Sequence, residues 1–164
     1  MDVVAVADTR TGRRLHVAGT RNGPAGYGRA VSSEESPTGD PAAAERVRAA
    51  VWARCAGQRG ARLDHPFGPE TAVFKVADKV FALVSERAAP GSVSLKCQPQ
   101  LGAALCETHR AVTPGYHLNK RHWITIALDG SVEGDLLDDL VDSSYDLVVA
   151  KLPRRTRAAL ASDV

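Results

Sequence analysis

The sequence predicts an α+β fold, a two-layer sandwich in which helices flank an antiparallel sheet, with the element order α-β-β-β-α-β-α. Three observations predict it. Apolar residues recur at helical spacing at Ala44, Val47, Val51 and Cys55. Two segments that alternate apolar and polar residues, TAVFKV and KVFALVS, are separated by two residues, which is typical of a β-hairpin. An amphipathic helix pattern, GDLLDDLVDSSYDLVV, follows the last predicted strand.

Length and composition indicate an ordinary globular protein. The chain has 164 residues, of which 44% are hydrophobic and 24% charged, so it holds one domain with some length to spare. A formal net charge of +2 favours no class of partner, and nucleic-acid binding would need a local basic patch. The three cysteines cannot all pair within one chain. Without a signal peptide or a long apolar run, they predict a cytoplasmic protein that has no membrane partner.

Composition divides the chain into three parts. Residues 1–40 are rich in Gly, Ser, Pro and charge, and we expect an N-terminal extension that is partly disordered. A short hairpin is predicted there around Thr9–Gly12, and the stretch from Thr20 to Gly39 is expected to be mobile. Residues 41–153 hold the predicted domain, and residues 154–164 are a C-terminal tail.

The first half of the domain is predicted as a helix followed by three strands. Asp40 and Pro41 form an N-cap and a first-turn proline, and the helix should end near Gly57–Gly60. The segment RLDHPFGPE is interpreted as a turn. The hairpin then turns at Ala77–Asp78, and GSVSLKC is the third strand.

The second half is predicted as helix, loop, strand and helix. QPQLGAALCETH indicates a short helix with Leu101 and Leu105 facing inward. The segment TPGYHLNKR is interpreted as a polar loop that leads into the strand HWITIALD. The last helix should bury Leu137, Leu140, Val141 and Val148 and is stopped by Pro153.

Four segments of the chain resemble the MmcQ/YjbR family, in the expected order and at the expected separations. They are HPFGPETAVFKVADKVFALVS, SVSLKC, TPGYHLNKRHWITIALDG and SSYDLVVAKLP, and the resemblance covers about residues 41–153. It implies a fold similar to frataxin and its bacterial homologue CyaY, described as a double wing. Members are commonly labelled DNA-binding, and one belongs to a mitomycin cluster, so the resemblance implies DNA or a drug as the partner.

No catalytic motif accompanies the histidines. The chain lacks a G-x-S-x-G motif, and Cys97 and Cys106, although near His117 and His122 in sequence, are interpreted as core residues. An enzyme that uses His117 or His122 as a general acid or base is the least favoured alternative. We therefore expect a non-enzymatic binding protein without a cofactor.

The last predicted helix carries a row of carboxylates on the face opposite its leucines. The functional interpretation of this row is that it binds iron. A solvated helix face, with the first acids stabilised by the helix dipole, is the preferred one, so no metal site is predicted. The acids are Asp135, Asp138, Asp139, Asp142 and Asp146.

A DNA-binding surface would have to lie away from these aspartates, because they repel phosphates. The sheet, the hairpin turns and the loop Asn119–Arg121 are the remaining elements. So few cations predict weak, salt-sensitive binding rather than tight sequence recognition. The basic residues considered are Lys75, Lys79, Lys96, Lys120, Arg121 and, in the extension, Arg10, Arg13, Arg14, Arg21 and Arg29.

The rival hypothesis is a planar small molecule, as for an antibiotic-binding or self-resistance protein. Strand alternation places His122 and Trp123 on opposite faces of the sheet. Flat apolar walls and a few polar anchors would form the site. The predicted walls are Phe67, Tyr116 and Trp123, and the anchors are Lys96, His117, Asn119 and Lys120.

A structural interpretation of Thr113–Gly130 stays open beside these two. In it, Tyr116 and Leu118 fill the core and Asn119 caps backbone groups. Tyr145 is a further candidate binding residue. Its structural alternative is core packing, with the hydroxyl bonded to this segment.

Overall fold

The computed structural model describes residues 6–7, 14–15, 41–85 and 90–162. The four helices in these ranges are α1 (Pro41–Ala56), α2 (Pro99–Thr108), α3 (Gly134–Val149) and α4 (Arg154–Ser162). The strands are β1 (Val6–Ala7), β2 (Arg14–Leu15), β3 (Ala61–Asp64), β4 (Thr71–Val76), β5 (Lys79–Ser85), β6 (Ser92–Lys96), β7 (Val112–Pro114) and β8 (Trp123–Ala127).

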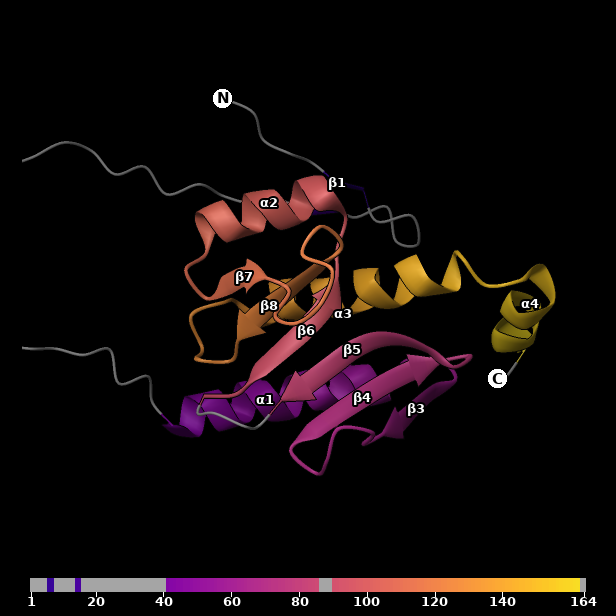
Figure 1. Cartoon of the computed structure of the whole chain (residues 1–164), viewed down its shortest axis with the longest axis horizontal. Coiled ribbons are helices and arrows are strands. Elements are labelled where there is room, and N and C mark those ends of the chain that lie inside the picture. Colours follow the sequence, from indigo (N-terminus) through magenta and orange to yellow (C-terminus); the bar gives the residue numbers. More distant parts are fainter. Residues whose placement is uncertain (1–5, 8–13, 16–40, 86–89, 163–164) are drawn as a thin grey trace, which may run out of the picture.

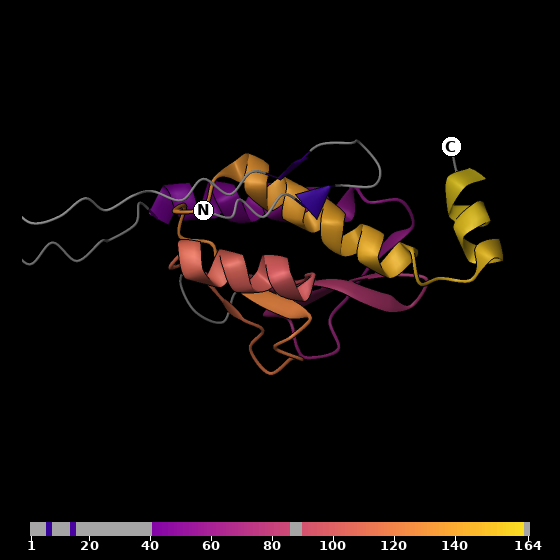
Figure 2. The same ribbon diagram turned by 90° about the horizontal axis from the view of Figure 1, so that it is seen from above.

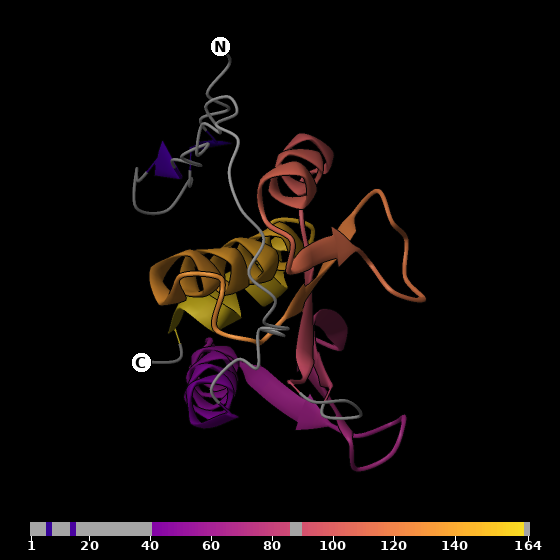
Figure 3. The same ribbon diagram turned by 90° about the vertical axis from the view of Figure 1, so that its left-hand side faces the viewer.

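The domain is built on one antiparallel sheet of six strands in the order β3-β4-β5-β6-β8-β7. Helices α1 and α3 cover one face of this sheet, and α2 lies beside its β7 edge (Figures 1 and 2). The opposite face carries no helix in the described ranges, and the loops β3–β4 and β7–β8 project on that side (Figure 3). The predicted two-layer α+β fold is confirmed.

The predicted hairpins are formed. Strands β4 and β5 pair around Ala77 and Asp78, which have φ angles of 46° and 61°. Two successive positive φ angles define the tight turn whose twist matches that of the flanking strands. In the N-terminal extension, β1 and β2 pair antiparallel, as the sequence predicts. The predicted mobile stretch, Thr20 to Gly39, lies outside the described residues.

A β-bulge at Phe81 joins the sheet to α3. Phe74 pairs with Ala82 and Lys75 with Val80, so Phe81 is the extra residue, and both Phe81 and Ala82 are fully buried. Ser144 of α3 fills the resulting gap between β5 and β6. Its hydroxyl donates to the Phe81 carbonyl oxygen at 2.5 Å and accepts the backbone N–H of Lys96 at 2.8 Å.

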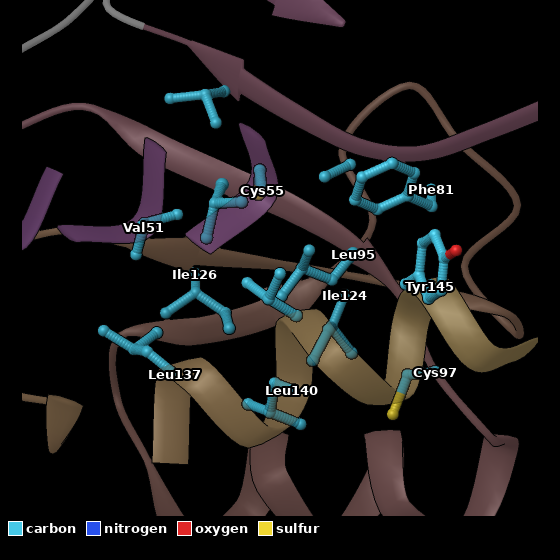
Figure 4. Packing of buried hydrophobic residues seen from close by; sticks show 14 of the residues in the cluster. Val51, Cys55, Phe81, Leu95, Cys97, Ile124, Ile126, Leu137, Leu140 and Tyr145 are labelled. Atoms are coloured by element: carbon cyan, nitrogen blue, oxygen red, sulfur yellow. The ribbon is translucent and has the colours of Figure 1, made fainter. Parts of the chain in front are cut away.

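The core lies between the sheet and the α1–α3 layer (Figure 4). The predicted inward faces are confirmed, because Val51 and Cys55 of α1 are buried, as are the four predicted residues of α3. A run of aromatic contacts crosses this core from α1 to α3. Such contacts stabilise the core beyond the effect of the area that each ring buries. It proceeds from Trp52 to Phe74, Phe81 and Tyr145 with ring centroids 5.2, 6.3 and 5.5 Å apart.

Three elements differ from the prediction. Strand β3 includes the first three residues of the segment interpreted as a turn, and β7 includes the start of the segment interpreted as a loop. Both are edge strands, where one side pairs and few side chains are buried, so apolar alternation is weak. The predicted C-terminal tail contains helix α4, which lies beyond the end of α3 (Figure 1). Among the described residues, no helix has the length and apolar character to cross a bilayer.

Candidate functional site

The loop between β7 and β8, residues 115–122, is built by backbone hydrogen bonds at its base and a side-chain turn at its end. The N–H of Gly115 donates to the Trp123 carbonyl oxygen at 2.8 Å, which closes the hairpin. An added Cβ at Gly115 would lie 2.7 Å from the Cβ of Trp123, so only glycine fits. Near the other end, Asn119 Oδ1 accepts the N–H of Arg121 at 3.0 Å. The prediction that Asn119 caps backbone groups is confirmed.

Two aromatic rings lie exposed at the tip of this loop. Tyr116 is 73% exposed, and its ring centroid is 3.9 Å from that of His117. His117 is also exposed and has a φ angle of 54°, a left-handed conformation that is unfavourable for a residue with a side chain. The expectation that Tyr116 and Leu118 fill the core is wrong for Tyr116, and Leu118 is only half-buried. The hairpin projects from the sheet and places the rings in solvent.

A run of basic side chains follows the two rings. Lys120, Arg121 and His122 are all exposed. Within the described ranges, neither Lys120 nor Arg121 forms a salt bridge. The sequence from Val112 to Leu128 contains no acidic residue. The tip of the hairpin is therefore a small cationic and aromatic surface, named here the β7–β8 tip, which comprises Tyr116, His117, Lys120, Arg121 and His122.

Trp123 and Lys96 lie directly behind this surface. They are paired across β6 and β8, and the Nζ of Lys96 is 4.4 Å from the centroid of the Trp123 ring. Trp123 is only 9% exposed, so it offers no open wall to a planar ligand. A small hollow of about 290 Å³ lies between α2 and the loop, bordered by Lys120, Arg121 and Cys106.

The residues predicted to form a wall for a planar ligand do not lie together in the structure. Phe67 is exposed but lies in the β3–β4 loop, at the opposite edge of the sheet from Tyr116. Lys75, on β4, forms a salt bridge with Asp64, and the hydrogen bond from Lys75 lowers the pKa of that carboxyl. Tyr145 is buried in the core, and its hydroxyl donates to the Arg59 carbonyl oxygen at 2.7 Å instead of to the segment Thr113–Gly130. The strand order thus separates Phe67 and Lys75 from the β7–β8 tip, and burial removes Tyr145 from any surface.

The cysteines are placed as core residues. Cys55 and Cys97 are buried, Cys106 is half-buried, and all three thiols are free. Burial raises the pKa of Cys55 to about 12 and that of Cys97 to about 11. A nucleophilic thiol needs a lowered pKa, so neither buried cysteine is poised for catalysis.

Among the aspartates of α3, Asp142 is paired with α1, Asp135 is exposed, and the other three are half-buried. Asp142 accepts hydrogen bonds from Arg54 of α1 and from Gln58, which follows that helix, and Arg54 also forms a salt bridge with it. This hydrogen bond raises the pKa of Arg54, and the charges of Asp138 and Asp139 raise it further. No group of three metal-ligating side chains occurs among the described residues. Asp142 therefore links α3 to α1, and the row of acids lies on the helical layer of the domain.

Sequence reasoning missed a larger hollow of about 460 Å³ at the end of the sheet. It is bordered by the start of β5, the end of β6 and the end of α3, and we name it the lysine hollow. The lining includes Lys79, Lys96, His122, Leu147, Lys151 and Leu152. The lysine and leucine that directly precede Pro153 were visible in the sequence, but nothing there places them beside Lys96.

Comparisons with known proteins support the fold. The YjbR family model matches residues 56–147. YbdF of Escherichia coli O157:H7 is 40% identical over 90 residues, which are 55% of this chain and 74% of that protein. YjbR of Escherichia coli K12 is 44% identical over 86 residues, 52% of this chain and 73% of that protein. The crystal structure of the DUF419 domain protein DR2400 from Deinococcus radiodurans is 37% identical, with a TM-score of 0.63 over 66% of this chain and 83% of that one.

Proposed function

The chain belongs to the YjbR family, and we propose that it is a DNA-binding protein that uses the β7–β8 tip. The segment that matches the family contains the whole β7–β8 hairpin. The observation that carries the proposal is the exposed Tyr116–His117 ring pair followed by three exposed basic residues. Aromatic faces stack on bases, and lysine and arginine contact phosphates. The proposal assigns DNA binding to this surface and no catalytic reaction.

The charge distribution of the two layers supports this orientation. The hairpin contributes only cations, whereas the carboxylates of α3 lie on the helical layer, where Asp142 is paired with Arg54. A duplex or strand that contacts the β7–β8 tip therefore meets no carboxylate of the hairpin itself. The loop projects on the side away from α1 and α3, which gives the phosphate backbone access to it (Figure 3).

The size of the surface sets the expected affinity. Two permanent cations, Lys120 and Arg121, contact at most a few phosphates, and each contact contributes about −0.9 to the slope of log affinity against log salt concentration. We therefore expect weak binding that is strongest at low salt. Tyr116 stacks best on an unpaired or unstacked base, so single-stranded or flexible sites are favoured.

Fluorescence anisotropy with labelled single-stranded and duplex DNA across a range of salt concentrations tests the proposal. The double variant Lys120→Ala/Arg121→Ala should weaken binding to every sequence and make the salt slope shallower by about 1.8. Tyr116→Ala should weaken single-strand binding by about 1–3 kcal/mol while leaving the slope unchanged. The matched control, Lys79→Ala/Lys151→Ala, removes two exposed lysines from the lysine hollow and should leave DNA binding intact. Undetectable binding to either form of DNA at low salt, or an equal loss in the control, would refute the proposal.

A further inference from the structure

The lysine hollow is a site that the proposed function does not use. It lies where β5 begins, β6 ends and α3 ends, and its volume of about 460 Å³ falls within the range of about 300–1,000 Å³ that small-molecule sites occupy. Its lining is drawn from four segments that are distant in the sequence, near residues 79, 96, 122 and 151. The hollow therefore exists only because the fold brings these segments together.

The charged lining of the hollow is positive only. Lys79 and Lys151 are exposed, Lys96 is half-buried, and the described residues of the lining include no carboxylate. None of the three lysines forms a salt bridge within the described ranges. Burial lowers the pKa of Lys96, and the neighbouring charge of Lys151 lowers it further. The ammonium groups of half-buried Lys96 and exposed Lys151 repel each other, and both are stabilised when an anion binds between them.

The remaining lining is largely apolar. The side formed by α3 and the residues that follow it is lined by Leu147, Val148 and Leu152. The rings of Pro99 and Pro153 add further apolar surface. Val148 and Leu152 belong to the core, so this wall is fixed by packing. An inorganic ion would leave the wall uncovered, whereas a ligand with an apolar body would cover it.

We propose that the lysine hollow binds a small amphipathic anion, whose carboxylate, sulfonate or phosphate group lies between Lys96 and Lys151 and whose apolar body lies on Leu147 and Leu152. Lys79 also lines the hollow and adds positive charge, and the imidazole of His122 can offer a hydrogen bond from the same lining. Nucleic acid does not suit this site, because a phosphate backbone would leave the apolar wall uncovered. The site and the β7–β8 tip therefore differ in the groups that they offer a ligand, and His122 is the residue that they share.

Two fluorescent probes that differ by one group test this site in the full chain. 1-Anilinonaphthalene-8-sulfonate carries a sulfonate, and N-phenyl-1-naphthylamine is the same molecule without it. The sulfonate probe should bind saturably and at least about tenfold more tightly, a difference of about 1.4 kcal/mol. Decanoate should displace it, and inorganic phosphate should do so only poorly.

Variants then locate the probe. Lys96→Met/Lys151→Met keeps apolar bulk and should reduce sulfonate binding by about tenfold or more, while binding of the neutral probe changes little. Lys151→Met alone removes an exposed charge and should show part of that loss even if Lys96→Met perturbs folding. Leu147→Trp should block both probes by filling the hollow. Lys120→Met, outside the hollow, is the matched control and should bind both probes normally. Equal affinity for the two probes, absence of saturable binding, or unchanged binding in the double lysine variant would each overturn the proposal.

Discussion

The ammonium group of Lys96 lies 4.4 Å from the centre of the Trp123 ring, directly across the β6–β8 pair. This contact connects the two surfaces described above. Lys96 borders the lysine hollow, and the backbone carbonyl of Trp123 holds Gly115 at the base of the β7–β8 loop. The charge of Lys96 is half-buried, and the electron-rich ring face partly compensates for its lost hydration.

The first prediction concerns the cover that Lys96 provides for Trp123. In a Trp52→Phe background, Trp123 is the sole tryptophan, and its low exposure predicts weak quenching by acrylamide. Lys96→Ala removes the side chain that lies over the ring, so quenching should increase clearly. Lys120→Ala, in the neighbouring loop, is the control and should change quenching little. Unchanged quenching in Lys96→Ala would mean that other residues shield the ring.

The second prediction concerns the tight approach at Gly115. Gly115→Ala places a methyl group 2.7 Å from the Cβ of Trp123 and 3.1 Å from its carbonyl oxygen, neither of which can rotate away. We expect a loss of about 1–3 kcal/mol in the free energy of unfolding, together with displacement of the loop. Gly134→Ala, where an added Cβ meets nothing within 4 Å, should change stability by less than about 0.5 kcal/mol. Chemical denaturation of both variants measures the difference, and equal stabilities would contradict it.

The elements that the sequence predicted well are those that bury a continuous face. Helix α3 has strong periodicity because one side packs into the core, and the β4–β5 hairpin joins two apolar strands by a tight turn. In α1 only a few apolar residues recur at helical spacing, and Val51 and Cys55 among them are buried. Strands β3 and β7 were missed because an edge strand is paired on one side only and its side chains are mostly exposed. Their residues also include Pro and Gly neighbours that favour a turn when read without the partner strand.

Of the two candidate surfaces, the sequence indicates only the one whose residues are adjacent in the chain. The β7–β8 tip is one continuous segment, so its aromatic and basic character follows directly from the order of its residues. The lysine hollow depends on bringing Lys79, Lys96 and Lys151 together, which strand order and the length of α3 decide. The planar wall of Phe67 and Tyr116 was wrong for the same reason, because the sheet places the two loops at opposite edges.

The third prediction concerns Ser144, the one fully buried polar side chain among the described residues. Ser144→Ala leaves the Phe81 carbonyl and the Lys96 N–H without their partner at the β-bulge. The expected cost is about 2 kcal/mol in the free energy of unfolding. Ser143→Ala, one residue earlier and half-buried, is the control and should have little effect. If both variants unfold at the same denaturant concentration, the hydroxyl does not link α3 to the sheet.

The fourth prediction concerns alkaline pH. Burial, then the charges of Asp142 and Asp138, raise the pKa of Cys55 to about 12 from an ordinary value of 9.0. The folded state therefore keeps a proton that the unfolded chain releases above about pH 9, so stability is present below that pH and is lost as pH rises toward 12. The slope from this group approaches about 1.4 kcal/mol per pH unit.

Urea denaturation at several pH values between about 8 and 11 measures this slope. Cys55→Ala is expected to lower stability at neutral pH, because it removes a buried side chain, but its stability should fall less steeply above about pH 9. The difference between the two slopes isolates the thiol from lysine and tyrosine titration. Parallel curves for the two proteins would show that the thiol does not retain its proton on folding.

The fifth prediction concerns the attachment of α4. Gly60 has a φ angle of 63°, and an added Cβ would overlap the Cδ2 of Leu160, while Arg59 donates to the Ala161 carbonyl oxygen at 3.2 Å. Gly60→Ala should therefore cost about 1–2 kcal/mol of backbone strain and also push Leu160 and α4 off the domain. Leu160→Ala should release α4 without strain at residue 60.

Gly68→Ala provides the matched control for this effect. Gly68 has a φ angle of 98°, but an added Cβ there meets nothing within 4 Å, so the variant should carry backbone strain alone. Hydrogen exchange of the amides in Arg154–Ser162 should be faster in Gly60→Ala and Leu160→Ala and unchanged in Gly68→Ala. If Gly60→Ala leaves exchange in α4 unaltered, Leu160 does not hold this helix. If Gly68→Ala accelerates exchange in α4 as much as Gly60→Ala does, general destabilisation explains the release better than a local contact.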